Sequence, residues 1–221
     1  LNTVLVPQIV RAAKAPDEGR TYVNRLVTLS ITALLVATVL LTLAAPWLVT
    51  LYSASVSPQW RAVGIGFAFW CIPQVFFYGL YTVLGQILNA KERFAGYMWA
   101  PALNNVVAIA GLGVFIALYG TGSRGEHDLA SWDATKIAVV GGLATLGVAV
   151  QALVLVFPLR AVGFKWRPVW GVRGVGLGSA GRVAGWTFAA AVVGQVGLVV
   201  TTNVANRASE LSSGTAMAAG T

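Results

Sequence analysis

The chain has 221 residues, of which 57% are hydrophobic and only 10% are charged, and its mean hydropathy is +0.75. Soluble domains carry a charge on about a quarter of their residues, so this composition excludes a soluble enzyme and a disordered chain. The single cysteine and single histidine exclude a disulfide scaffold and a zinc protein. We attribute the net charge of +8 to membrane topology and lipid headgroup contacts, and to no nucleic-acid partner.

Five long segments without Asp, Glu, Lys or Arg indicate membrane spans, because each exceeds the roughly 18 residues that cross a bilayer as a helix. They cover residues 26–60, 62–90, 94–123, 137–159 and 183–206. The helices predicted within them cover residues 26–50, 62–89, 97–119, 137–160 and 183–206. The predicted fold class is therefore all-α: a polytopic transmembrane bundle of five full spans, preceded by a partial helix in the first residues.

Prolines lie at informative positions in three of these spans. Pro46, followed by Trp47 and Tyr52, marks the outer membrane boundary of the first span. Pro73 lies in the middle of the second span and predicts a kink near residues 69–73, because proline lacks one backbone donor. In the third span, Pro101 and the nearby Asn105 are predicted to have a structural or hinge role, like Pro73.

The last span carries a face of small and polar residues, which include Gln195 and Asn203. Such a face on an apolar helix either packs against other helices or lines a wet cavity. The residues alone leave both interpretations open.

Basic residues alternate between the loops. The loops at 11–25, 89–96 and 160–182 hold eleven of the fifteen Lys and Arg residues. Cytoplasmic loops of membrane proteins carry this excess. We therefore expect these three loops to face the cytoplasm, and residues 52–61, 120–136 and 206–221 to face outward.

No catalytic or cofactor-binding constellation stands out. The glycine pattern at 174–181 lacks the preceding strand of a dinucleotide-binding unit, and His127 has the features of a lone solvated histidine. Carboxylate pairs, Ser/His pairs and metal-ligand spacings are absent at membrane depth. We therefore expect no enzyme activity, no catalytic residue, no cofactor and no metal site.

The ends of the sequence suggest a piece of a larger protein. The chain begins Leu1-Asn2-Thr3 without a Met, and the apolar residues 1–10 are too short to span a membrane. We expect these residues to be the end of a helix that starts upstream.

Several segments resemble the lipid II flippase family (MurJ, MviN) of the multidrug/oligosaccharidyl-lipid/polysaccharide exporter superfamily. The most specific is GQILNAKERFAGYMWAPALNN at 85–105, which is similar to the family's short inner loop between helices 4 and 5. LNTVLVPQIVRA at 1–12 resembles the end of helix 2, and AAPWLVTLY at 44–52 the end of helix 3. Residues 185–209 resemble helix 7.

The resemblance implies a transporter of two six-helix lobes that works by alternating access. Residues 1–182 would hold the end of helix 2, helices 3–6 and the basic 6–7 loop of the first lobe, and 183–221 the start of the second. The implied cargo is the undecaprenyl-pyrophosphate-linked peptidoglycan precursor, moved from the inner to the outer leaflet of the bacterial plasma membrane. The family's cavity arginines lie on helices 1, 2 and 8. In the present chain, Asn2, Gln195 and Asn203 are the candidates for the substrate cavity.

Two other functions remain open from the sequence. One is another exporter of the same superfamily, for a polyprenyl-linked glycan or a drug. The other is a membrane scaffold that binds cell-wall synthesis proteins through the basic 160–182 loop.

Overall fold

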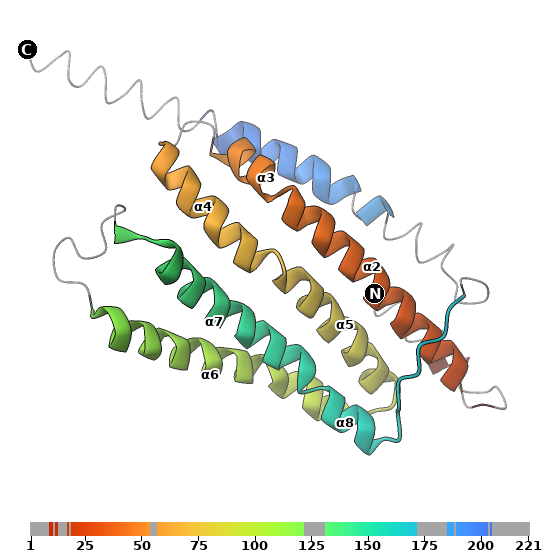
Figure 1. Cartoon of the computed structure of the whole chain (residues 1–221). Coiled ribbons are helices and arrows are strands. Elements are labelled where there is room, and N and C mark those ends of the chain that lie inside the picture. The colour runs from red at the N-terminus through yellow and green to blue at the C-terminus, as the bar shows by residue number, and fades with distance from the viewer. Residues whose placement is uncertain are drawn as a thin grey trace, which may run out of the picture.

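The computed structural model describes residues 9–10, 12, 17, 19–53, 57–121, 131–171, 185–187, 189–202 and 204. Within these residues the chain is all-α, with no strand (Figure 1). The helices are α2 (Arg20–Leu43), α3 (Ala45–Tyr52), α4 (Pro58–Cys71), α5 (Gln74–Ala90), α6 (Phe94–Tyr119), α7 (Ala134–Leu153) and α8 (Val156–Ala161). A further helix, Gly185–Thr202, lies beside α2 and α3 in Figure 1.

Five helical segments are long and apolar enough to cross a membrane, which confirms the predicted polytopic bundle. They are Arg20–Leu43, Pro58–Ala90, Phe94–Tyr119, Ala134–Ala161 and Gly185–Thr202. The first predicted span, 26–50, is longer in the structure and consists of α2 and α3. The partial helix predicted for residues 1–12 lies mostly outside the described residues.

Three of the spans are made of two helices each, and a proline lies at or just after every break. Pro46 is in the first turn of α3, Pro73 immediately precedes α5, and Pro158 is in α8. Proline cannot donate a backbone hydrogen bond and its ring clashes with the preceding turn. The break between α4 and α5 is where the sequence predicts a kink.

The helices pack side by side in the order α2, α5, α7 and α6 at one end of the bundle (Figure 1). The core lies between α2, α5, α7 and α8, where Ile87, Leu88 and Leu155 are completely buried. Apolar side chains also cover the outside; Ile109 of α6, for example, is 72% exposed. A large exposed apolar surface is consistent with a membrane environment.

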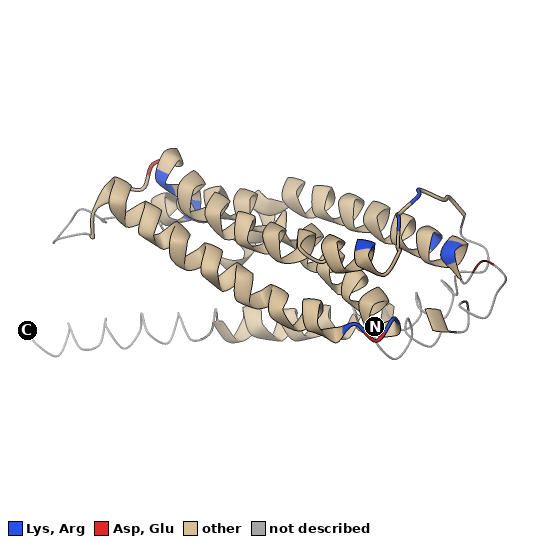
Figure 2. Ribbon diagram, turned by 90° about the horizontal axis from the view of Figure 1, so that it is seen from below, with Lys and Arg blue, Asp and Glu red and all other residues tan. Residues whose placement is uncertain are grey.

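Among the described residues, the connections place most of the charges at one end of the bundle, where α2 and α6 begin and α5 and α8 end. We call this the basic end; it holds Arg20, Lys91, Arg93, Arg160, Lys165 and Arg167 (Figure 2). The opposite end, the far end, holds Arg61, Asp133 and Lys136.

The start of α2 is fixed by a charged cap. The two carboxylate oxygens of Asp17 accept hydrogen bonds from the backbone N–H groups of Gly19, at 3.1 Å, and Thr21, at 3.0 Å. Hydrogen bonds from the side chain and backbone of Thr21 hold the pKa of Asp17 below its ordinary value. The carboxylate is therefore charged at neutral pH, and a negative charge at a helix N-terminus is favourable.

Candidate functional site

The break between α4 and α5 is bridged by a side chain from α7. Thr145 Oγ1 lies 2.6 Å from the Trp70 carbonyl oxygen and 2.8 Å from the Gly141 carbonyl oxygen, and it accepts a hydrogen bond from Gln74 Nε2 at 3.1 Å. A hydroxyl has one proton, so Thr145 donates to one carbonyl at a time. In a membrane interior each unpaired backbone group costs several kcal/mol, and Thr145 therefore stabilises the interruption beside Pro73.

Pro101 lies inside α6, and the helix continues through it from Phe94 to Tyr119. The nitrogen of Pro101 cannot donate to the carbonyl of Tyr97, which is four residues earlier. Instead the Tyr81 hydroxyl of α5 donates to that carbonyl at 3.0 Å. The Tyr81 and Tyr97 rings are stacked with their centroids 4.8 Å apart. The tyrosine pair thus replaces a lost helical hydrogen bond and joins α5 to α6.

The two asparagines after Pro101 lie in different environments. Asn104 is half-buried and contacts Gly147 of α7, where a Cβ would meet its side-chain oxygen. Asn105 is exposed on the surface of α6. The hinge role predicted for Pro73, Pro101 and Asn105 stays a prediction, whereas the contacts of the first two are now defined.

Gln195 is the one predicted cavity residue that lies within the described part of the chain. Its side-chain oxygen accepts a hydrogen bond of 2.7 Å from the Tyr52 hydroxyl at the end of α3. Asn2 and Asn203 lie outside the described residues, so their cavity role stays a prediction. The Tyr52–Gln195 pair joins the Gly185–Thr202 helix to the first span, and both partners are exposed enough for the bond to open.

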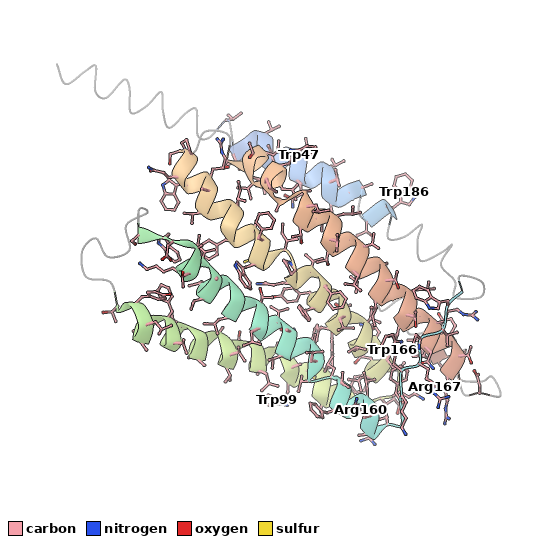
Figure 3. All side chains as sticks on the ribbon, in the orientation of Figure 1. Trp47, Trp99, Arg160, Trp166, Arg167 and Trp186 are labelled. Carbon is pink, nitrogen blue, oxygen red and sulfur yellow. The ribbon has the colours of Figure 1, made fainter. Side chains whose placement is uncertain are left out.

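At the basic end, residues 164–169 run along the first turns of α2. The Arg167 backbone N–H donates to Asn24 Oδ1 at 3.0 Å. Thr28 Oγ1 accepts two hydrogen bonds of 3.2 Å, from Trp166 Nε1 and from the Val169 backbone N–H. Figure 3 shows Arg160, Trp166 and Arg167 together at this end of the bundle. The basic segment therefore has a defined position against α2.

We expect Thr28→Val to loosen this segment, because the substitution removes the acceptor of two hydrogen bonds. Each hydrogen bond contributes about 0.5–1.5 kcal/mol, so amide exchange at Val169 should become about tenfold faster in hydrogen–deuterium exchange of the whole protein. Thr32→Val is the matched control, since among the described residues Thr32 Oγ1 bonds only the Thr28 carbonyl within its own helix, at 2.9 Å. Equal exchange at Val169 in the two variants would contradict the anchoring role of Thr28.

The site residues predicted from the sequence do not include Tyr52, Tyr81, Asn24, Thr28 or Thr145. Tyr52 was interpreted only as an interfacial aromatic, and neither Thr145 nor Thr28 was singled out. Asn24 and Thr28 did carry a signal, because polar residues four apart share one face of a helix. The signal for Thr145 is weaker. It is the one hydroxyl-bearing residue in the predicted span 137–160, and this span packs against one that a proline interrupts.

The described residues have the features of a transporter more than those of a catalytic site. Within them there is no group of three or more His, Cys, Asp or Glu residues that could hold a metal ion. What they do provide is broken helices whose free backbone groups are paired across helix boundaries, one exposed contact between spans, and a basic end. Broken helices with re-paired backbone groups recur in transporters.

The family model described as lipid II flippase MurJ matches residues 1–219. No solved structure matches the chain.

Proposed function

The chain belongs to the lipid II flippase family, and we propose that helices α2 to α8 form part of one lobe, against which the Gly185–Thr202 helix moves during transport. The family transports the lipid-linked peptidoglycan precursor, so the chain is a transporter of the multi-pass inner-membrane class and not an enzyme. We assign residues 1–182 to the first lobe and 183–221 to the start of the second. The cargo crosses from the inner to the outer leaflet by alternating access.

The physical problem for such a protein is the headgroup of its cargo. A pyrophosphate and a sugar must cross about 30 Å of hydrocarbon, and an unpaired buried charge is prohibitively costly. The spans of this chain have no Lys or Arg in their interiors. This chain therefore contributes uncharged polar groups to the substrate path, and the candidates are Asn2, Gln195 and Asn203.

The main observation in support of this proposal is the hydrogen bond between Tyr52 and Gln195. It connects residues 143 positions apart and joins the end of α3 to the Gly185–Thr202 helix. An exposed bond of this kind contributes only about 0.5–1.5 kcal/mol, so it can form in one state of the transporter and open in the other. In this scheme Gln195 pairs with Tyr52 in one state and faces the substrate path in the other.

The charge distribution supports an orientation. Because basic loops remain cytoplasmic, we propose that the basic end faces the cytoplasm, with loops 11–25, 89–96 and 160–182. Tyr52 and the end of α3 then lie near the outer surface. The Tyr52–Gln195 contact would accordingly close the outward side of the path.

The test is to deplete the full-length protein in its host, to supply variants, and to measure the precursor accessible on the outer leaflet. We expect depletion to lower the outer pool while the inner pool swells, and Gln195→Leu to restore the outer pool only in part. Thr201→Val is the matched control on the same helix, because within the described part of the chain Thr201 Oγ1 bonds only the Gly197 carbonyl, at 2.8 Å. This variant should restore the outer pool fully.

Two outcomes would contradict the proposal. A normal precursor distribution in depleted cells that still fail to grow would favour a scaffold that binds cell-wall synthesis proteins. Full restoration by both variants would leave the transport function in place but would remove Gln195 from the path.

A further inference from the structure

A pocket of about 610 Å³ opens between α2, α5, α7 and α8 at the basic end. Its walls are apolar and include Ile31, Leu84 and Leu153, and its rim carries Arg160, Lys165 and Trp166. The volume is within the range of about 300–1,000 Å³ that is typical of small-molecule sites. An apolar interior with a cationic rim fits a ligand that has an apolar chain and an anionic head.

The rim is held in place by the contacts described above. Trp166 is tied to Thr28 through its indole N–H, at 3.2 Å, and the next residue donates its backbone N–H to Asn24, at 3.0 Å. Lys165 immediately precedes this anchored pair, and Arg160 lies on α8 across the same pocket. The two cations therefore project from fixed backbone and not from a free loop.

The charges at the rim are not neutralised within the described part of the chain. Arg160 and Lys165 are exposed, and neither has an ion pair with another described residue. Tryptophan is enriched at the depth of the lipid headgroups, and Trp166, which bonds Thr28 of α2, lines the pocket together with the two cations. Basic pockets between transmembrane helices on the cytoplasmic side bind anionic lipid headgroups.

We propose that this pocket binds an anionic glycerophospholipid of the membrane leaflet at the basic end. One acyl chain lies against Ile31, Leu84 and Leu153, and the phosphate is bound by Arg160 and Lys165. The bound lipid connects α2 to α7 and α8 and secures the 164–169 segment. The proposal does not depend on the cargo, because the pocket lies among α2, α5, α7 and α8 and not between these helices and the Gly185–Thr202 helix, where the proposed path runs.

The experiment uses the full-length protein, purified and stripped of lipid, and titrated with phosphatidylglycerol or phosphatidylcholine of identical acyl chains in native mass spectrometry. We expect phosphatidylglycerol to bind more tightly than phosphatidylcholine. Each cation near a headgroup changes the affinity about fivefold, so Arg160→Gln with Lys165→Gln should lower the affinity for phosphatidylglycerol about thirtyfold. Arg167→Gln is the control, since it removes a charge from the same segment but does not line the pocket.

A second pair of variants tests the apolar part of the pocket. Leu153→Trp should fill the pocket and weaken phosphatidylglycerol binding while Arg160 and Lys165 remain. Leu153 is 51% exposed, so the larger side chain can be accommodated without disturbing the core. Leu146→Trp is the control, because Leu146 is on the same helix, is 50% exposed and lies outside the pocket.

Three results would overturn the proposal. The first is equal binding of the two phospholipids, and the second is equal loss of affinity in the Arg160/Lys165 variant and in Arg167→Gln. The third is displacement of phosphatidylglycerol by undecaprenyl phosphate at lower concentration, which would assign the pocket to the tail of the cargo. Since binding is measured without transport, these results are distinct from a failure of the flippase function.

Discussion

Replacing Gly141 with alanine is expected to destabilise the bundle by about 1–3 kcal/mol, the usual cost of overpacking a tightly packed contact. A Cβ at Gly141 would lie 2.6 Å from the Cβ of Trp70. Neither atom can move without its backbone, so α4 and α7 must separate. The separation would also lengthen the hydrogen bond from Thr145 to the Trp70 carbonyl, now 2.6 Å.

The neighbouring glycine provides the control for this experiment. A Cβ at Gly142 would lie 3.4 Å from the Trp70 ring, which is ordinary contact distance, and alanine has a higher helix propensity than glycine. We expect Gly142→Ala to be neutral or slightly stabilising. Thermal unfolding of both variants in the same detergent measures the difference; equal stability would show that the contact between α4 and α7 is not tight.

The second large effect is expected at the tyrosine pair of α5 and α6. Tyr81→Phe removes the donor to the Tyr97 carbonyl, which Pro101 already leaves without a helical partner. An unsatisfied buried acceptor costs about 1–3 kcal/mol, and we expect a loss of stability in this range. Pro101→Ala restores the backbone N–H, so Tyr81→Phe should cost much less in that background.

A double-mutant cycle of Tyr81→Phe and Pro101→Ala measures this coupling. The control is Tyr78→Phe on the same helix, because Tyr78 is 46% exposed and its hydroxyl has no hydrogen bond within the described residues. Its effect should remain within about 0.5 kcal/mol. If Tyr81→Phe costs the same with and without Pro101, the hydroxyl does not replace the helical bond and the interpretation is wrong.

These two sites illustrate why the interior of this bundle is difficult to predict. In a soluble helix the apolar stripe identifies the buried face. Here the faces toward lipid and toward other helices are both apolar, so Ile109 and Leu155 look alike in the sequence, although the first is 72% exposed and the second is fully buried. Periodicity therefore finds the helices but does not pair them.

The candidate site, like the helix packing, can be predicted only in part from the sequence. The family and the transport function followed from local motifs, above all residues 85–105, and the match over residues 1–219 confirms them. Gln195 was singled out as a polar residue in an apolar span, but its partner Tyr52 is 143 positions away. From the sequence, Gln195 either packs against another helix or lines the substrate path. The structure adds its contact with Tyr52, which is compatible with both interpretations.

Local features of the sequence predict the five spans, the alternation of basic loops and the break beside Pro73, but not the breaks near Pro46 and Pro158. Each of these depends on short stretches of chain, because hydropathy, charge and a missing backbone donor act locally. Helix packing decides which side chains bond the backbone at these places: Thr145 bonds the Trp70 carbonyl at the break beside Pro73, and Tyr81 bonds the Tyr97 carbonyl that Pro101 leaves free. It also decides that Asn24 and Thr28 hold the basic segment on α2. Such contacts join residues far apart in the chain, and they exist only once the helices have packed.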